Sequence, residues 1–283
     1  MTDDAALTAT AARAHPPEVS AAKARRWGAF YYAEQVLRVM KGYSWSILMY
    51  SVGQPVAYLF AMGVGLATLV DTGDAGAFGG VSYLAFIAPA LLVSAAVMTA
   101  ANEFTFPVMG GFKWRRTYYG PHASPLTPEQ IAAGQIIAVT LRLLLQSAIY
   151  YAAVALFGAS PSSWGWAGIV VATLAGLSFG LPLMAYSASI KEDKGQFALV
   201  MRFIVMPLFL FSGTFFPLDT LPWAVRWIGW ISPIWHGTEL GRVFSYGYQE
   251  PPVLTLVHFV VLTALAALGW FLTRGQFVRR LGQ

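Results

Sequence analysis

Long stretches without a charged side chain constrain this sequence more than any other feature. Six predominantly apolar segments divide the chain, at residues 46–70, 81–106, 131–157, 166–190, 197–216 and 253–273. About 20 apolar helical residues are enough to cross the hydrocarbon core of a bilayer. Only 11% of the residues are charged, against about 25% in an average soluble domain. We therefore expect an all-α integral membrane protein with six transmembrane helices.

The lysines and arginines between these segments predict the topology. They gather before the first segment, in alternate loops and after the last segment, at Arg13, Lys23, Arg25, Arg26, Arg38, Lys41, Lys113, Arg115, Arg116, Lys191, Lys194, Arg274, Arg279 and Arg280. The intervening loops hold only Arg226 and Arg242. Cytoplasmic loops of membrane proteins are enriched in these bases, so we expect both termini in the cytoplasm. The net charge of +5 does not predict nucleic-acid binding, because the bases flank apolar segments instead of forming a stripe.

The region before the first segment divides into two parts. Residues 1–22 are rich in Ala and Thr, contain a Pro-Pro pair and lack a continuous apolar run, so we expect a disordered cytoplasmic tail. In residues 23–43, aromatic and aliphatic side chains recur at helical spacing among bases. That pattern predicts an amphipathic helix in the inner interface, although an extension of the first span is the alternative. Gly42 offers a break at the membrane edge, and residues 44–283 would then form the six-span domain.

Residues 219–252 are unusually apolar for an outer loop. Four tryptophans fall at Trp223, Trp227, Trp230 and Trp235, and Pro217, Pro222 and Pro233 divide the segment into pieces too short to cross a bilayer. We expect a re-entrant helical hairpin that follows the fifth span. An aromatic belt on a helix lying at the surface is the alternative interpretation.

The sequence offers no catalytic or metal site. A glycine-rich phosphate loop, a His-Glu-x-x-His motif and cysteine are all missing from the chain. The four histidines, His15, His122, His236 and His258, are scattered, and we interpret each as an interfacial or packing residue. We therefore expect neither an enzyme nor a cofactor in this chain.

Three ionisable residues fall inside or at the edge of the predicted spans. Glu103 lies near the inner end of the second span, Arg142 lies in the inner part of the third, and Arg202 lies in the fifth. Such residues are costly in a membrane and usually have a partner. Because an inner loop joins the second and third spans, we predict a Glu103–Arg142 pair, with Arg202 as the competing partner. The pair could act as a lever for transport or only as a packing clamp.

The inner loop that follows the second span combines aromatic and basic residues. The mixture comprises Lys113, Trp114, Arg115, Arg116, Tyr118 and Tyr119. Aromatic residues and arginine are typical anchors of protein interfaces, so residues 113–125 are the predicted docking loop for a cytoplasmic partner. We expect a short helix over 113–119, and Thr127-Pro128-Glu129-Gln130 is a favourable start for the next helix.

Four stretches resemble the membrane subunit of type-2 ABC exporters, in the branch of daunorubicin and nodulation lipo-oligosaccharide exporters. They are residues 54–66 (QPVAYLFAMGVGL), residues 83–92 with 103–107 (YLAFIAPALL, EFTFP), residues 124–129 (SPLTPE) before Gly134, and residues 206–217 (MPLFLFSGTFFP) with Leu221-Pro222 and residues 232–237 (SPIWHG). The resemblance implies six spans, an inner amphipathic helix and a re-entrant pair. It also implies a bacterial inner-membrane location and a dimer, either of two copies or with a close paralogue.

The resemblance further implies that each half binds a separate ABC ATPase, so that two ATPase copies supply ATP and Mg²⁺ chemistry and residues 113–125 receive them. We therefore expect a permease that exports an amphipathic substrate, such as a drug, a lipid or a lipo-oligosaccharide. A permease for a lipid-linked polysaccharide is the nearest alternative, and a membrane enzyme or a sensor subunit that transports nothing is a further one. Phe209, Phe211, Phe215 and Phe216 form a candidate hydrophobic gate in the fifth span, although ordinary helix packing would also explain them.

Overall fold

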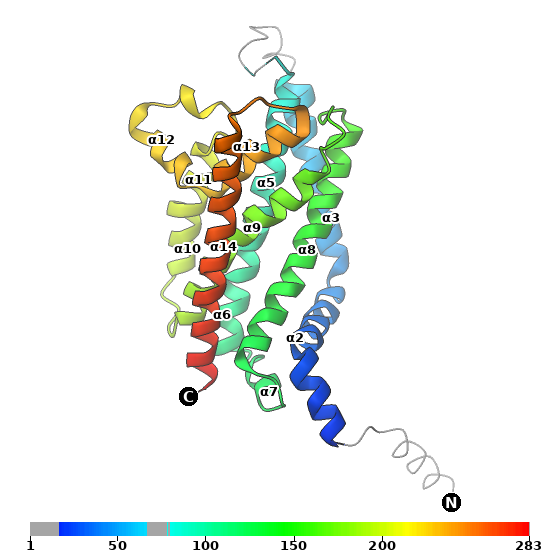
Figure 1. The fold of residues 1–283 in the computed structure, drawn as a ribbon, viewed down its shortest axis with the longest axis vertical. Coiled ribbons are helices and arrows are strands. Elements are labelled where there is room, and N and C mark those ends of the chain that lie inside the picture. The colour runs from blue at the N-terminus through cyan, green and yellow to red at the C-terminus, as the bar shows by residue number, and fades with distance from the viewer. Residues whose placement is uncertain (1–16, 67–77, 79, 283) are drawn as a thin grey trace, which may run out of the picture.

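The computed structural model describes residues 17–66, 78 and 80–282, and every regular element among them is helical (Figure 1). In chain order these elements are α2 (Pro17–Lys41), α3 (Ser44–Phe60), η1 (Ala61–Leu66), α5 (Tyr83–Phe104), α6 (Phe106–Lys113), α7 (Tyr119–His122), α8 (Pro128–Leu156), α9 (Ala167–Ser189), α10 (Gln196–Val200), η2 (Met201–Val205), α11 (Met206–Phe211), η3 (Leu218–Thr220), α12 (Trp223–Trp230), α13 (Pro233–Tyr246) and α14 (Pro252–Leu281). The prediction of an all-α membrane protein is confirmed.

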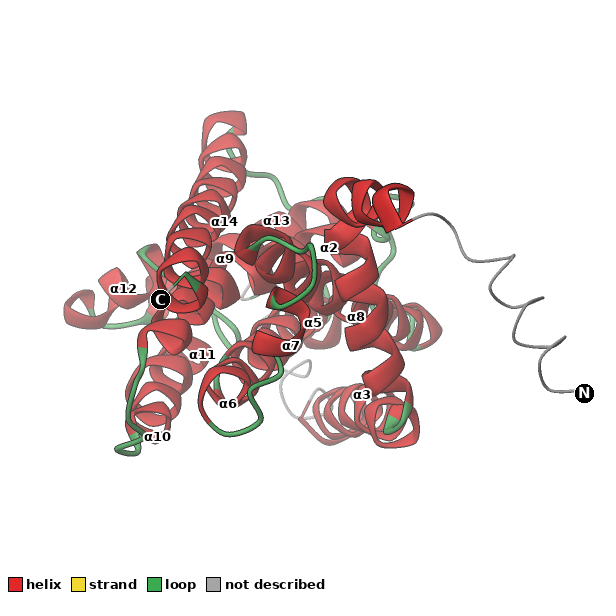
Figure 2. Cartoon of the chain, turned by 90° about the horizontal axis from the view of Figure 1, so that it is seen from below, coloured by secondary structure: helices red, strands yellow, loops and turns green. Residues whose placement is uncertain are grey.

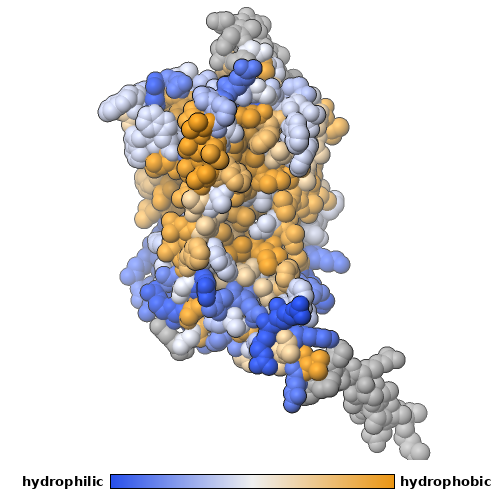
Figure 3. All heavy atoms as spheres, in the orientation of Figure 1, coloured by the Kyte–Doolittle hydropathy of each residue, from blue (hydrophilic) through white to orange (hydrophobic). Residues whose placement is uncertain are grey.

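Four helical stretches of the described chain are long and apolar enough to cross a membrane. They are Tyr83–Lys113, Pro128–Leu156, Ala167–Ser189 and Pro252–Leu281. On the face drawn in Figure 3, apolar side chains cover the middle of the molecule and hydrophilic side chains gather at its two ends. The predicted first span corresponds to α3 with η1 as far as Leu66, and its remaining residues lie outside the described part. The predicted fifth span is the shorter apolar helix Gln196–Phe211, so the count of six spans stays a prediction.

Helix α5 forms the centre of the bundle. In its most apolar part 89% of the residues are buried, against 17% for α14. Helices α8, α9 and α13 pack around α5, and the view from below in Figure 2 places α3, α10 and α14 at the periphery. A helix that is apolar on every side is stable either in a protein core or in lipid. The low burial of α14 therefore indicates that most of its surface faces lipid.

The first turns of α2 and the last turns of α14 lie at the same end of the bundle (Figure 1). We call this the C-terminal end, and the opposite one the far end. Helix α2 begins at Pro17, before the residue 23 expected from the sequence, and proline is favoured in the first turn of a helix. It ends at Lys41, and a turn at Gly42 separates it from α3. Residues 1–16 of the expected tail lie outside the described chain, and the domain division stays a prediction.

Helix α8 begins with a capping box, as the sequence predicts. The Thr127 side chain accepts a hydrogen bond from the Gln130 backbone N–H, and the Gln130 side chain accepts one from the Thr127 N–H. This arrangement satisfies two of the N–H groups that lack helical partners. Gln130 Nε2 also donates to the Arg25 carbonyl over 2.6 Å. The start of α8 is thereby tied to α2.

The short helices α12 and α13 lie at the far end (Figure 1). Proline occupies the position before α12 and the first position of α13, at Pro222 and Pro233. The two helices differ in environment, because Trp223 of α12 is 82% exposed whereas most of α13 is buried among α5, α9 and α14. Their entry into a bilayer as a re-entrant hairpin stays a prediction.

Candidate functional site

The structure brings Glu103 and Arg142 together in an ion pair between α5 and α8. Their side chains are only 14% and 17% exposed. Arg202 lies exposed on η2, and among the described residues it has no ion pair. A buried pair that loses one partner leaves an uncompensated charge. The pair joins the C-terminal half of α5 to α8, and its role in transport stays a prediction.

A largely apolar groove of about 500 Å³ lies beside this pair, between α2, α3 and α8. Met40, Trp45, Leu48, Leu141 and Leu145 contribute apolar walls, and Arg142 and Gln146 contribute polar atoms. Ligand sites usually combine an apolar lining with a few placed polar groups. The groove therefore has the chemistry to hold an amphipathic molecule.

The loop after α6 differs from the predicted short helix. Helix α6 ends at Lys113, where the expected helix begins, and the chain then turns through Arg116 at φ +51° before α7. Trp114 is 56% exposed, and its ring lies 5.3 Å from Lys113 Nζ. Arg115, Arg116 and Tyr119 are also exposed. An aromatic and basic surface therefore does form at the C-terminal end.

Tyr118 does not belong to that surface, which corrects its expected place among the docking residues. Its side chain is 2% exposed, and its ring contacts Tyr32 of α2, Phe112 of α6 and Phe277 of α14. The turn at Arg116 directs Tyr118 inward while leaving Tyr119 outside. Tyr118 is thus a core residue directly beneath the exposed surface.

The four phenylalanines of the candidate gate lie in and just after α11. Phe209 and Phe215 meet edge to face, with ring centroids 5.2 Å apart. Phe211 and Phe216 are half-buried, and in the described chain only the Phe209–Phe215 pair of the four makes a mutual ring contact. A gate that closes on a second copy of the chain stays a prediction.

A polar cluster at the far end was missed by the sequence analysis. Arg242 donates to Glu239 over 2.8 Å and to the Gly213 carbonyl over 2.7 Å, and its guanidinium lies 3.8 Å from the Phe86 ring centre. Glu239 and Arg242 also line a cavity of about 520 Å³, with Trp230, Trp235, Tyr246 and Glu250. The three-residue spacing of Glu239 and Arg242 on one helix was the available signal.

Two of the histidines that look scattered in the sequence meet in this cluster. The Nδ1 atoms of His236 and His258 are 2.6 Å apart, and His258 Nε2 lies 2.7 Å from Glu250 Oε1. His236 precedes Glu239 by three residues, so both face the same side of α13. Within the described chain no group of three or more His, Cys, Asp and Glu side chains has the arrangement of a metal site. The contact between the two Nδ1 atoms has the length of a hydrogen bond.

Comparisons with known proteins cover most of the chain. The family model described as ABC-2 type transporter matches residues 33–246. Nodulation protein J of Rhizobium leguminosarum bv. trifolii is 28% identical over 235 residues, which cover 83% of this chain and 86% of that protein. Nodulation protein J of Rhizobium meliloti (strain 1021) is 27% identical over 232 residues, which cover 82% of this chain and 85% of that protein. The matched region contains the Glu103–Arg142 pair, the loop after α6 and helices α12 and α13.

Proposed function

Because the chain belongs to the ABC-2 type transporter family, we propose that it is the membrane-spanning permease of an ATP-driven exporter. It would move an amphipathic substrate from the cytoplasm or the inner leaflet to the outside of a bacterial inner membrane. The observation that carries this proposal is the combination of apolar helices long enough to span a bilayer with an exposed aromatic and basic surface at one end of the bundle.

The exposed surface after α6 supports a separate ATPase as the partner. Trp114, Arg115, Arg116 and Tyr119 offer a flat ring and guanidinium groups, which are frequent anchors in protein interfaces. Positive charge there also agrees with a cytoplasmic location. Two ATPase copies would serve two permease copies, and ATP and Mg²⁺ would bind to the ATPase.

The packing beneath this surface supports a mechanical link. Tyr118 lies between the docking residues Arg116 and Tyr119 in the sequence, and it contacts side chains of α2, α6 and α14. Protein interiors are close-packed and transmit displacement instead of absorbing it. A push from the ATPase on Trp114 and Tyr119 would therefore move these three helices together.

The groove beside Arg142 supports an amphipathic substrate. Its walls are aliphatic and aromatic, with the Arg142 guanidinium and the Gln146 amide as polar partners. An acyl chain or a fused ring system would bury apolar surface there, and a polar head would reach polar side chains of the lining, which also include Lys41, Ser44 and Ser51. A drug, a lipid and a lipo-oligosaccharide can each combine an apolar part with a polar part.

The test uses the full chain, coexpressed with a partner ABC ATPase. We expect the double variant Trp114→Ala/Tyr119→Ala to lose copurification of the ATPase and substrate-stimulated ATP hydrolysis, with an unchanged melting temperature. The matched control is Trp223→Ala/Trp227→Ala, which removes two exposed tryptophans at the far end. Wild-type association and turnover of the Trp114→Ala/Tyr119→Ala variant would reject this docking surface.

A further inference from the structure

A continuous chain of polar atoms runs through the far end of the bundle. His236 Nε2 lies 3.0 Å from the Trp230 carbonyl oxygen, and His236 Nδ1 lies 2.6 Å from His258 Nδ1. His258 Nε2 lies 2.7 Å from Glu250 Oε1. Both imidazoles are buried, at 4% and 1% exposure. This row of polar atoms thus joins the end of α12 to α13, to α14 and to the loop between the last two helices.

The number of protons in this row of polar atoms follows from the groups at its two ends, the Trp230 carbonyl and the Glu250 carboxylate. The Trp230 carbonyl can only accept a hydrogen bond, and an ionised Glu250 carboxylate can only accept as well. The three contacts between these ends therefore need three protons. Two neutral imidazoles supply two, and each buried contact without a proton would set two lone pairs against each other.

One additional proton satisfies every contact. A protonated His258 donates from Nε2 to Glu250 and from Nδ1 to His236 Nδ1. A neutral His236 then donates from Nε2 to the Trp230 carbonyl. A fourth proton would place two N–H groups face to face at the 2.6 Å contact. The geometry therefore accommodates one extra proton and rejects a second.

We propose that His236, His258 and Glu250 form a binding site for a single proton, which fastens α12 and α13 to the start of α14. The site holds its charge opposite the Glu250 carboxylate. Release of that proton removes one of the three hydrogen bonds. The packing of α12 and α13 against α14 is then less stable. The stability of this packing therefore depends on the pH of the compartment that the far end faces.

The surrounding charges agree with this assignment. Arg242 engages Glu239 on α13, which leaves Glu250 as the carboxylate that meets the imidazoles. Glu250 Oε2 also accepts a hydrogen bond from the Thr255 hydroxyl over 3.2 Å. Tyr246, Tyr248 and Asp219 line the same cavity. Helix α9 contains no Asp, Glu, His, Lys or Arg, and α5 adds only the Tyr83 phenol near this end.

The cavity gives the proton a route to water. Trp230, Glu239, Arg242 and Glu250 line its volume of about 520 Å³. Glu250 is thus shared between the cavity and the imidazole pair. A proton can therefore exchange with solvent through the Glu250 carboxylate without opening the helices.

The dependence of stability on pH has two limbs. A folded state that keeps one proton more than the unfolded chain loses stability as the pH rises. Unfolded histidines release their protons at about pH 6.5, so this loss begins above that pH. Burial, followed by the charge of His258, lowers the pKa of His236 to about 4. The folded state therefore also loses stability as the pH falls from about 6.5 towards 4.

Nitrogen NMR of the full chain with ¹⁵N-labelled histidine tests the proton count. The sequence has only four histidines, and His236→Gln, His258→Gln and His122→Gln variants assign the signals. At pH 7.5 we expect three N–H groups on the four ring nitrogens of His236 and His258. In Glu250→Gln, whose amide NH₂ group can donate to His258 Nε2, two N–H groups satisfy every contact, and we expect two. Two N–H groups in the unaltered protein would overturn the proposal.

Thermal unfolding of the purified chain across pH 7 to 9 separates proton binding from simple packing. We expect the apparent Tm of the wild type to fall by about 2 °C or more over this range. His258→Gln should show a lower Tm at pH 7 and a flat profile. His122→Gln, at the other end of the bundle, should follow the wild type. A wild-type slope that persists in both His258→Gln and Glu250→Gln would reject the site.

Discussion

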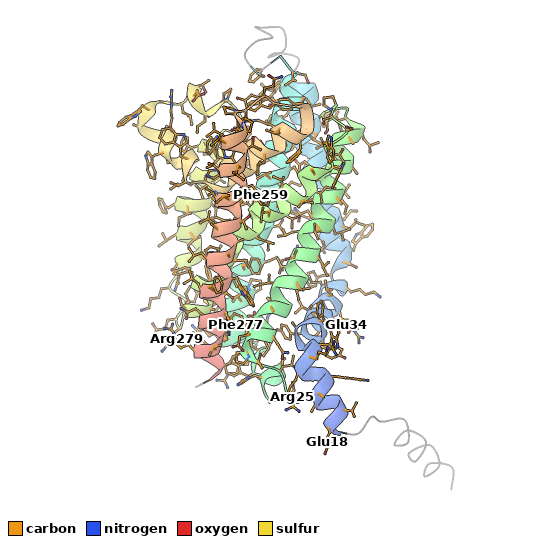
Figure 4. All side chains as sticks on the ribbon, in the orientation of Figure 1. Glu18, Arg25, Glu34, Phe259, Phe277 and Arg279 are labelled. Atoms are coloured by element: carbon orange, nitrogen blue, oxygen red, sulfur yellow. The ribbon has the colours of Figure 1, made fainter. Side chains whose placement is uncertain are left out.

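The ring centroid of Tyr118 lies 5.1 Å from that of Phe277, with the ring planes at 66°. The contact joins the loop after α6 to the last turns of α14, where Figure 4 labels Phe277. Phe112 packs on both rings, at 4.7 Å and 4.9 Å. Edge-to-face aromatic pairs add about 0.5–1.5 kcal/mol beyond the burial of their area. This aromatic cluster therefore anchors the proposed docking loop to the bundle.

We expect Tyr118→Ala to destabilise the chain, because it removes a buried aromatic ring from that cluster. Replacing a buried large aromatic by alanine typically costs about 3–5 kcal/mol. The apparent Tm in detergent should fall by about 6 °C or more. Tyr119→Ala is the matched control, since its side chain is 40% exposed and should leave the Tm within about 1 °C. An equal Tm for the two variants would contradict the buried position of Tyr118.

The crossing of α9 and α14 depends on a close backbone approach. A Cβ atom at Gly269 would lie 2.5 Å from the Pro182 nitrogen and 2.6 Å from the Leu181 Cβ. One turn later, Thr273 Oγ1 donates to the Leu181 carbonyl over 3.1 Å. Small residues permit such approaches between membrane helices. Any side chain at position 269 must therefore push the helices apart.

We expect Gly269→Ala to lower stability by about 1–3 kcal/mol, the usual cost of overpacking. Gly275→Ala on the same helix is the control, because a Cβ there has no atom within 4 Å. Thermal unfolding in detergent measures both. Equal Tm values for the two variants would show that α14 does not contact α9 at Gly269.

The sequence was sufficient for the helices and for one intramembrane contact. Apolar stretches of about 20 residues have few alternatives to a helix in lipid, since every backbone group needs an internal partner. Glu103 and Arg142 could be paired from their depth in the predicted spans, because one inner loop joins these two spans and so predicts that their helices are neighbours. Arg202 was a competing partner only because the sequence does not say which side of the fifth helix it occupies.

The inward direction of Tyr118 in the aromatic loop and the contact between the two histidines could not be predicted for a different reason. Tyr118 and Tyr119 have the same chemistry, and only the backbone turn at Arg116 decides which one faces inward. His236 and His258 meet because α13 packs along the start of α14. That contact depends on tertiary packing, which no periodicity within either helix reveals. Composition therefore located the surfaces, and geometry was needed to choose the residues.

The ion pair between α5 and α8 predicts coupling in a double-mutant cycle. We expect Glu103→Ala and Arg142→Ala each to reduce stability and transport, and the double variant to lose less than the sum. Residues in contact typically show interaction energies of about 0.5–3 kcal/mol. Arg202→Ala combined with Glu103→Ala should be additive, since Arg202 lies exposed on η2. Additivity of the Glu103 and Arg142 changes would mean that the pair contributes no energy.

Single cysteines should report the orientation of the bundle, because the chain contains no native cysteine that could react. Ala123 follows α7 at the C-terminal end and Gln249 precedes α14 at the far end, and both are exposed. Bases concentrate at the C-terminal end, and the positive-inside rule places that end in the cytoplasm. In intact cells, an impermeant thiol reagent should therefore label Gln249→Cys but not Ala123→Cys. Permeabilised cells should show both, and Ser245→Cys should react slowly in either, since Ser245 is buried. Labelling of Ala123→Cys in intact cells, with Gln249→Cys protected, would reverse the topology and remove the loop after α6 from the reach of any cytoplasmic ATPase.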